Sequence, residues 1–435
     1  MHLQKAKNLS GEITIAGDKS ISHRALILSS MAIGTTYIYG LLEAEDVLNT
    51  AKALQALGVA MNRSEDGVWE VNGVGIGGLT EPTQILDMGN SGTGARLLMG
   101  LVAPYPFNAF FCGDESLTKR PMNRIMNPLK EMGATFVSRS KGRLPIAVIG
   151  EENMLPISYK LPVASAQVKT AILLAALNTA GKTTVIEPKA TRDHTEIMMA
   201  DFGIEVDIQD VAGEKHITIE GQQEITVDNK EIGIAGDPSS AAFLVAAALI
   251  TKGSDIIIKN VCLNKTRAGI FDTLLEMGAD ITFNNKRCVA GEDVADIAVK
   301  YSELKGVEVP VKRVPSMIDE FPILAVVASF AEGKTVMRGL AELKVKESDR
   351  LQAIYEGLLA CGVKATVGDD SLVVEGGNVK GGTTITTHKD HRIAMSFLVM
   401  GLAAEDAVFV DDIASIGTSF PEFFDLCKAL GIVVL

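Results

Sequence analysis

A three-residue step, in which a glycine stands between two apolar residues, recurs six times along this chain. The six steps are Leu57-Gly58-Val59, Met132-Gly133-Ala134, Phe202-Gly203-Ile204, Met277-Gly278-Ala279, Cys361-Gly362-Val363 and Leu430-Gly431-Ile432. Each one follows a stretch with the pattern of a helix and leads into an expected strand. The glycines are 69 to 84 residues apart, which is too long for a solenoid unit and fits one βαβαββ repeat. The chain is therefore expected to contain six copies of one α/β unit.

Each repeat also has a first helix, whose start is marked by a hydroxyl or acidic residue. These starts lie near Ser20, Thr93, Ser165, Ser239, Ser316 and Asp390. Such residues are favourable because their oxygens accept free N–H groups of the first turn. The runs that follow, such as 171–176, 241–249 and 323–327, are apolar on nearly every side. They are expected to form buried helices, whereas the second helices are amphipathic.

Two of the helix starts are close copies of each other. Gly17-Asp18-Lys19-Ser20 is matched by Gly236-Asp237-Pro238-Ser239, 219 residues later. This match divides the six repeats into two halves of three. No long polar linker separates the halves, so the sequence predicts two domains joined by short crossing segments.

The composition limits what the chain can bind. Its 435 residues are 47% apolar, enough for two or three domains with large cores. A net charge of −13 and only 5% aromatic residues argue against nucleic acid as a ligand. No apolar run is long enough to span a bilayer, and no secretory signal is recognisable. The five cysteines include no CxxC pair, so reduced thiols and a cytoplasmic location are expected.

Charged residues that differ between the repeats are candidates for chemistry, since the shared residues serve packing. At or just after the helix starts, most of them are basic: Lys19, Arg24, Arg120, Arg192, Lys346, Arg350 and Arg392. Helix N-termini attract anions, and arginine offers two parallel N–H groups to a phosphate or carboxylate. Several such ends around one cleft would bind a ligand with several anionic groups. Asp319 and Glu320 would then either favour the helix dipole or be placed for proton transfer.

Two kinds of apparent motif are rejected. Gly181-Lys182-Thr183 and Gly333-Lys334-Thr335 resemble the end of a phosphate-binding loop, but each lacks the earlier glycine and lies between a helix and a strand in the reverse order. This disfavours a phosphoryl-transfer enzyme. His388 and His391 have the spacing of metal ligands on a helix, but no third ligand type is clustered with them. Neither a metal nor a cofactor is expected.

Seven segments resemble, in the same order, the motifs of the 5-enolpyruvylshikimate-3-phosphate (EPSP) synthase family. They are Gly17–Arg24, Gly89–Arg96, Leu117–Met122, Ser165–Gln167, Asp319–Glu320, Lys346–Arg350 and Asp390–Arg392. The resemblance covers the whole chain and implies the enolpyruvyl transferase fold, an α/β fold of two inside-out barrels with helices inside and sheets outside. The implied domains are 18–235, with repeats one to three, and 1–17 plus 236–435, with repeats four to six. The active site is expected in the cleft between them.

The resemblance also implies a reaction. EPSP synthases transfer the enolpyruvyl group of phosphoenolpyruvate to the 5-hydroxyl of shikimate 3-phosphate by addition and elimination, and release phosphate. This step belongs to the shikimate pathway, which leads to chorismate and the aromatic amino acids. It requires protonation of a methylene carbon, deprotonation of a hydroxyl, and neutralisation of phosphate and carboxylate charge. Closure of the domains would supply much of the rate through preorganised electrostatics.

Roles for individual residues follow from the same resemblance. Shikimate 3-phosphate would be held by Lys19, Ser20, Arg24, Ser165, Ala166, Gln167, Arg192, Asp319 and Lys346. Phosphoenolpyruvate would be held by Lys19, Asn90, Gly92, Arg120, Gln167, Glu347, Arg350, His391 and Arg392. Asp319 is implied as the base toward the hydroxyl, Glu347 as proton donor and acceptor at the methylene carbon, and Lys19 as an aid to proton transfer.

Some positions depart from the usual pattern of the family. Thr418 stands where many members have a basic residue that contacts phosphoenolpyruvate, and Ala166 stands where many have Ser. The segments 165–169 and 192–196 resemble the second class, whose best-known members tolerate glyphosate. In some tolerant members Ala occupies the position of Gly92 and crowds the inhibitor. Because Gly92 removes that obstacle, glyphosate is expected to compete with phosphoenolpyruvate here. The protein is expected to be a monomer.

Two alternatives lie outside this assignment. The sister enzyme that uses UDP-N-acetylglucosamine has the same fold and donor, but it carries Asn after the first Lys and usually a Cys as proton donor in a loop. Here Ser20 follows Lys19, and Cys112 precedes the Arg120 segment rather than lying within it. A non-catalytic anion-binding protein is the second alternative. Asp319 and Glu347 argue against it, because acids beside a polyanion weaken binding unless they move protons.

Overall fold

The computed structural model describes residues 1–435 and divides them into two compact units. The N-terminal unit comprises Gly17–Ile234 and Val289–Glu292, and the C-terminal unit comprises Met1–Ala16, Ala235–Cys288 and Asp293–Leu435. The bounds differ by one residue from 18–235. They also differ at 289–292, which was assigned to the second domain. This segment packs on the N-terminal unit: the Glu292 carboxylate lies 2.6 Å from Nδ1 of His194. A side chain at Gly291 would meet Ile197.

The N-terminal unit contains three four-stranded sheets. Their strand orders are β13-β2-β4-β3, β5-β6-β8-β7 and β9-β10-β12-β11. The strands are β2 (Ile33–Tyr39), β3 (Ala60–Arg63), β4 (Trp69–Val74), β5 (Leu86–Asp87), β6 (Asn108–Cys112), β7 (Thr135–Arg139), β8 (Arg143–Ile149), β9 (Ser158–Lys160), β10 (Lys182–Glu187), β11 (Val206–Val211), β12 (Glu214–Glu220) and β13 (Lys230–Gly233). The helices are α1 (Lys19–Met31), α2 (Glu45–Ala56), α3 (Gly92–Val102), the 3-10 turn η1 (Leu117–Lys119), α4 (Asn123–Glu131), α5 (Ala166–Leu177) and α6 (His194–Asp201).

The C-terminal unit contains sheets of four, three and two strands. Their orders are β1-β14-β16-β15, β17-β19-β18 and β20-β21. The strands are β1 (Ser10–Thr14), β14 (Asp255–Cys262), β15 (Asp280–Val289), β16 (Glu292–Lys300), β17 (Lys334–Arg338), β18 (Lys364–Val367), β19 (Ser371–Glu375), β20 (Thr383–Ile385) and β21 (Val408–Val410). The helices are α7 (Pro238–Ile250), α8 (Gly269–Glu276), η2 (Val311–Ser316), η3 (Ile318–Glu320), α9 (Phe321–Ser329), η4 (Ala341–Val345), α10 (Arg350–Ala360), α11 (His391–Met400), η5 (Ala414–Thr418) and α12 (Phe423–Ala429).

The last two repeats are shorter than the predicted βαβαββ pattern. In the fifth repeat, isolated bridges from Lys305 and Glu308 take the place of a first strand. In the sixth, two parallel strands are supplemented by a bridge between Leu3 and Val434, which brings the two chain ends together. These segments therefore follow the path of the repeat without a full hydrogen-bonded ladder.

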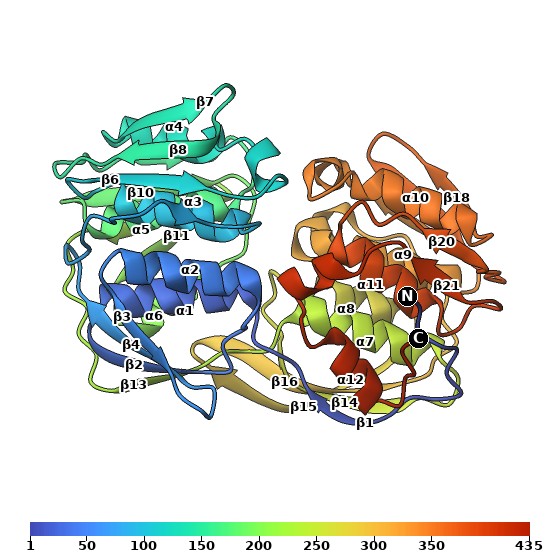
Figure 1. Ribbon diagram of the computed structural model, residues 1–435. Helices are drawn as coiled ribbons and strands as arrows, with labels where there is room; N and C mark the ends of the chain where they lie inside the picture. Colours follow the sequence, from blue (N-terminus) through green and yellow to red (C-terminus); the bar gives the residue numbers. More distant parts are fainter. The chain divides into compact units, whose positions relative to one another are not determined.

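Each unit completes its first sheet with a strand from a distant part of the chain. β1 pairs in parallel with β14, and β13 pairs in parallel with β2. In Figure 1 the dark blue β1 lies beside β14. The chain therefore crosses between the units near residue 16 and again near residue 234. The helices α1 and α7 begin a few residues after these crossings, at Lys19 and Pro238.

The core of each unit is built from its first helices. All thirteen residues of α7 and all nine of α9 are buried, as the continuous apolar runs predict. In the C-terminal unit α7, α9 and α11 contact one another, and in the N-terminal unit α3 packs against α5. Because the sides of these helices are buried, their N-terminal ends are the parts that can contact a ligand. No helix of the chain is both long and apolar enough to cross a membrane.

The recurring glycine steps end the six second helices. All six glycines have a positive φ, from 79° at Gly362 to 121° at Gly133. The N–H of the residue after each glycine donates to the carbonyl five residues earlier, at 2.9 to 3.1 Å. This is the Schellman arrangement, in which a left-handed residue reverses the chain and an apolar residue follows. Only glycine adopts this backbone without strain, which explains the recurrence.

A substitution at one of these steps should cost stability through the backbone alone. Nothing lies within 4 Å of a Cβ built at Gly203, whose φ is +82°. We therefore expect Gly203→Ala to lower the free energy of unfolding by about 1 kcal/mol. Urea unfolding followed by the fluorescence of Trp69, the single tryptophan, reports this unit. Gly377→Ala is the matched control, since it also meets open space but lacks a positive φ; because it lies in the C-terminal unit, its unfolding is followed by far-UV circular dichroism. Equal effects of the two substitutions would contradict this explanation.

The helix starts follow the prediction except in the fifth repeat. Side chains of Asp18, Ser91, Ser165, Asp237 and Asp390 cap the first helices of the other five. The predicted start near Ser316 was wrong, because α9 begins at Phe321 after η2 and η3. Pro322 has no N–H and fits only the first helical turn, so the α-helix starts late. As a result Asp319 and Glu320 lie in η3, before the helix.

Candidate functional site

The predicted site residues form two clusters, one in each unit. The N-terminal cluster collects at the starts of α1, α3 and α5 and in the segments before α4 and α6. It contains Lys19, Ser20, Arg24, Asn90, Gly92, Arg120, Ser165, Ala166, Gln167 and Arg192. The C-terminal cluster lies in η3, before and at the start of α10, and at the start of α11. It contains Asp319, Lys346, Glu347, Arg350, His391 and Arg392.

In the N-terminal cluster, Arg24 is fixed by neutral oxygens. Its Nε donates to Oγ1 of Thr195 at 2.7 Å, and one Nη donates to Oγ1 of Thr170 at 2.9 Å. The other Nη donates to the carbonyl of Ser20 at 2.9 Å. Burial lowers the pKa of Arg24 to about 10, against the effect of nearby carboxylates, while Arg192 lowers it further. Arg24 therefore stays protonated at neutral pH, and Arg192 lies close enough to influence it.

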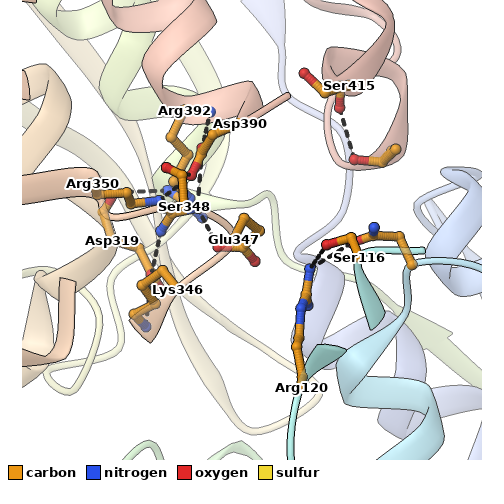
Figure 2. A network of polar contacts seen from close by, with 12 residues as sticks. Ser116, Arg120, Asp319, Lys346, Glu347, Ser348, Arg350, Asp390, Arg392 and Ser415 are labelled. Atoms are coloured by element: carbon orange, nitrogen blue, oxygen red, sulfur yellow. Dashed lines mark hydrogen bonds and ion pairs between the residues drawn. The ribbon is translucent and has the colours of Figure 1, made fainter. Parts of the chain in front are cut away.

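Arg120 and Gln167 are each held by a partner on α3 or beside it. Arg120 donates to Oδ1 of Asn90 at 2.9 Å and to Oγ of Ser116 at 3.0 Å, as Figure 2 shows for Ser116. Arg96 donates to Oε1 of Gln167 at 2.7 Å. The Gln167 amide in turn donates to Oγ1 of Thr93 at 2.9 Å. These contacts join the starts of α3 and α5 in one polar group.

Gly92 lies against two of these guanidinium groups. A Cβ built at this position would stand 3.1 Å from an Nη of Arg96 and 3.2 Å from an Nη of Arg120. Both distances are shorter than a relaxed van der Waals contact. The absence of a side chain at Gly92 thus lets Arg96 and Arg120 approach the N-terminus of α3.

Lys19 is the first residue of α1 and is partly exposed. Its Nζ forms an ion pair with Asp46 at 3.0 Å. His23, one turn later, is fully buried, and its Nδ1 lies 2.8 Å from Oγ1 of Thr50. Burial, with help from Lys19 and Arg24, lowers the pKa of His23 to about 3. His23 is therefore neutral at physiological pH and packs the helix start rather than supplying charge.

Arg350 is the centre of the C-terminal cluster. It is 1% exposed, and its guanidinium contacts Asp390 at 2.8 Å, Asp319 at 3.2 Å and Glu347 at 2.6 Å (Figure 2). Burial alone would lower its pKa, but Asp390, Glu347 and Asp319 outweigh that effect and raise it. One buried cation thus joins three carboxylates that come from three different segments of the chain.

Asp390 is the fully buried carboxylate of this group. Besides Arg350, it accepts a hydrogen bond from Ser348 Oγ at 3.0 Å and caps α11 by accepting from the Arg392 N–H at 2.9 Å. Burial would raise its pKa, but Arg350 in particular outweighs that and lowers it. Two left-handed residues, His388 and Lys389, precede Asp390. The sequence marked Asp390 only as a helix start, so its role as a partner of Arg350 was missed.

Asp319 and Glu347 differ in their access to solvent. Asp319 accepts contacts from Lys346 at 3.1 Å and from Arg350, and its side chain is 12% exposed. The Glu347 side chain is 28% exposed. Two carboxylates beside two cations form an arrangement that can take up and release protons while the cations neutralise anionic ligands.

Arg392 is tied to a second buried network. One Nη donates to the backbone carbonyl of Asp319 and to Oε1 of Glu320, both at 3.1 Å. Ser239 donates to the same Glu320 oxygen, and Arg267 donates to Ser239 at 2.9 Å. Nothing in the sequence connected Ser239 or Arg267 with Arg392, because this contact needs the α7 start and η3 to meet.

The segment with Thr418 provides no basic side chain. Thr418 donates to the carbonyl of Ser415, which is labelled in Figure 2, at 2.7 Å within the turn η5. η5 packs against α11, which carries His391 and Arg392. His391 is the first residue of α11 and is 6% exposed. No group of three His, Cys, Asp or Glu side chains in the chain could hold a metal ion.

Comparisons with known proteins agree with these motifs. The model of the family described as EPSP synthase (3-phosphoshikimate 1-carboxyvinyltransferase) matches residues 3–426. The 3-phosphoshikimate 1-carboxyvinyltransferase of Paramagnetospirillum magneticum is 57% identical over 431 residues, which cover 98% of this chain and 96% of that protein. An EPSP synthase structure from Acinetobacter baumannii has a TM-score of 0.88 at 42% identity, covering 99% of this chain and 97% of that chain.

A more distant structure shows the shared fold. The enolpyruvyl transferase NikO from Streptomyces tendae has a TM-score of 0.77 at 18% identity, covering 99% of this chain and 97% of that chain. These comparisons confirm the enolpyruvyl transferase fold and the family predicted from the seven segments. The alternatives of a non-catalytic anion-binding protein and a phosphoryl-transfer enzyme are set aside. The chain therefore belongs to the EPSP synthase family, the 3-phosphoshikimate 1-carboxyvinyltransferases.

Proposed function

We propose that the two clusters together transfer the enolpyruvyl group of phosphoenolpyruvate to the 5-hydroxyl of shikimate 3-phosphate. In the addition step the hydroxyl oxygen bonds to C2 of phosphoenolpyruvate while the methylene carbon gains a proton. In the elimination step the resulting methyl group loses a proton and phosphate leaves. The observation that carries the proposal is the placement of Asp319 and Glu347 around the cations Lys346 and Arg350.

Shikimate 3-phosphate would be bound mainly by neutral and cationic groups of the N-terminal cluster. These are Lys19, Ser20, Arg24, Ser165, Ala166, Gln167 and Arg192. Lys346 and Asp319 would complete the set from the C-terminal cluster. Asp319 is the proposed base toward the 5-hydroxyl, and its ion pairs with Lys346 and Arg350 place it among the cations of the C-terminal cluster.

Phosphoenolpyruvate would be bound by Lys19, Asn90, Gly92, Arg120, Gln167, Glu347, Arg350, His391 and Arg392. Arg350 is engaged by three carboxylates. We propose that the substrate displaces Glu347, the most exposed of the three, from Arg350. Glu347 would then be free to give a proton to the methylene carbon and take one back, with Lys19 assisting.

The replacement of a basic residue by Thr418 has a consequence for this scheme. The Thr418 hydroxyl bonds within its own turn, so phosphoenolpyruvate would depend on Lys19, Arg120, Arg350 and Arg392 for its countercharge. We propose that the reaction takes place where both clusters reach the substrates together, in the interdomain cleft.

Phosphate release tests the function directly. We expect release from phosphoenolpyruvate only when shikimate 3-phosphate is also present, and we expect it to persist in excess chelator. Release with UDP-N-acetylglucosamine but not with shikimate 3-phosphate would assign the sister reaction instead. Light scattering of the same preparation tests the proposal that the enzyme is a monomer. The five free cysteines support a reducing compartment, and we propose the cytoplasm.

Glyphosate is proposed to inhibit by competing with phosphoenolpyruvate. A Cβ at position 92 would press on Arg96 and Arg120 at 3.1 and 3.2 Å, so Gly92→Ala should displace a guanidinium. We expect the inhibition constant of glyphosate to rise by about tenfold or more. The KM for phosphoenolpyruvate should rise less, because that ligand is shorter. Gly377→Ala, which meets open space, should change neither constant. Inhibition by glyphosate that does not depend on phosphoenolpyruvate concentration would contradict the proposal.

A further inference from the structure

Arg24 and Arg350 are both buried arginines, but their surroundings differ. Arg350 contacts three carboxylates. The three hydrogen bonds of Arg24 instead go to two threonine hydroxyls and one backbone carbonyl. A buried charge is usually compensated by a direct ion pair. The charge of Arg24 is thus held in place without being neutralised by contact.

Glu196, a carboxylate close enough to Arg24 to raise its pKa, is engaged elsewhere. Glu196 is adjacent to Thr195 in α6, but its Oε1 lies 2.6 Å from Nζ of Lys169. Glu187 lies 3.0 Å from the same ammonium group. Lys169 is fully buried and has no role in the proposed reaction. Its two ion pairs hold Glu196 and Glu187 in a separate charged group.

The two threonines between these groups act as one unit. Oγ1 of Thr170 and Oγ1 of Thr195 lie 2.6 Å apart, and each also accepts from Arg24. Thr170 follows Lys169 on α5, and Thr195 precedes Glu196 on α6. His194, beside Thr195, is fixed by Glu292 at 2.6 Å. The hydroxyl pair is therefore anchored on two helices.

We infer that Thr170 and Thr195 are positioning residues that hold Arg24 for an anionic group of shikimate 3-phosphate, while Lys169 keeps Glu196 from neutralising it. This inference rests on the proposed role of Arg24. The two threonine hydroxyls accept hydrogen bonds from two N–H groups of Arg24 and so orient its guanidinium. The Ser20 carbonyl accepts from a third N–H group. Of the five N–H groups of a guanidinium, two then remain for the ligand. An arginine paired with a carboxylate would have to break that pair before it could bind an anion.

Threonine-to-valine changes remove the hydroxyls and keep the shape. We expect Thr195→Val to weaken shikimate 3-phosphate binding by about tenfold or more, since a hydrogen bond to a charged group is lost. Calorimetry without phosphoenolpyruvate measures this directly. At saturating shikimate 3-phosphate, the KM for phosphoenolpyruvate should stay within about twofold of the original value, because the effect acts only through Arg24. Thr195→Ser keeps the hydroxyl and should restore binding.

The controls separate positioning from simple loss of structure. Thr183→Val removes a buried hydroxyl that has no hydrogen-bond partner, and it should leave both constants unchanged. The inference would be overturned if Thr195→Val left shikimate 3-phosphate binding unchanged. It would also be overturned if the Kd for shikimate 3-phosphate and the KM for phosphoenolpyruvate rose equally. If Arg24→Met also binds shikimate 3-phosphate normally, the proposed role of Arg24 itself is wrong. If Arg24→Met weakens shikimate 3-phosphate binding but Thr195→Val does not, Arg24 has its proposed role and the positioning role of the threonines is wrong.

The role of Lys169 can be tested by replacing it and then restoring the effect with a second substitution. Lys169→Met should release Glu196 to compensate Arg24 and so weaken shikimate 3-phosphate binding. Adding Glu196→Gln removes that charge, and at least part of the affinity should return. If the second change brings no recovery in the folded double variant, Lys169 does not act in this way.

Discussion

Replacing Glu347 by Gln is expected to lower kcat by about 10²–10⁴-fold, the usual contribution of a positioned general acid or base. The substitution keeps the size of the side chain and removes the exchangeable proton. It also removes the ion pair of 2.6 Å with Arg350. Because that pair competes with phosphoenolpyruvate for the same guanidinium in our proposal, the KM for phosphoenolpyruvate should not rise.

The two kinetic constants distinguish proton transfer from a structural role. If Glu347 only orients Arg350, Glu347→Gln should raise the KM for phosphoenolpyruvate and leave kcat nearly unchanged. The matched control is Glu342→Gln, an exposed glutamate in the preceding turn η4, which should affect neither constant. Steady-state phosphate release at varied phosphoenolpyruvate and saturating shikimate 3-phosphate measures both constants for each variant.

The sequence was most informative where a local rule decides the structure. The six glycine steps mark helix ends because a left-handed residue is needed there, and this need depends on neighbouring residues alone. The caps at Ser165 and Asp390 could be read for the same reason. In the fifth repeat a local rule also applies: Pro322 fits only the first turn of a helix, so α9 starts at Phe321 and not near Ser316.

The sequence was least informative about the partners of the site residues. Arg24 was a candidate from its motif, but its contacts Thr170 and Thr195 lie 146 and 171 residues away. The link from Arg392 through Glu320 to Ser239 likewise depends on how η3 packs beside α7. Such contacts are properties of the packed core. Pairing rules can say that a buried charge needs a partner, but not which residue supplies it.

The position of the 289–292 segment also depends on contacts that the sequence does not indicate. Its sequence belongs to the β15–β16 hairpin, most of which lies in the C-terminal unit. The His194–Glu292 contact and the closeness of Gly291 to Ile197 place the tip in the N-terminal unit. A histidine and a glutamate 98 residues apart carry no signal of this pairing. Arg96 and Asp390, which contact predicted site residues, do carry a signal, because they lie in the motif segments 89–96 and 390–392.

The largest loss of stability is expected from Asp390→Asn. Asp390 is fully buried, and its carboxylate accepts hydrogen bonds from the Arg350 guanidinium, the Ser348 hydroxyl and the backbone N–H of Arg392. Asparagine can still cap α11, but it leaves Arg350 with one fewer buried countercharge. Removing one partner of a buried ion pair typically costs about 3–5 kcal/mol, and we expect a loss of this size in the C-terminal unit. Far-UV circular dichroism in urea measures it, with the fluorescence of Trp69 as an internal reference for the N-terminal unit.

The pH dependence of this loss identifies its electrostatic origin. The pKa of Asp390 is lowered in the folded protein, since Arg350 in particular outweighs the effect of burial. A carboxylate with a lowered folded pKa contributes stability above its unfolded pKa of about 3.9, and loses it as pH falls through the folded value. The stability difference between the original protein and Asp390→Asn should therefore be full near pH 7 and shrink below about pH 4. Asp349→Asn, at the exposed cap of α10, should cost about 1 kcal/mol or less. A difference for Asp390→Asn that stays constant into acid would mean that packing, and not the charge of Asp390, is what the substitution removes.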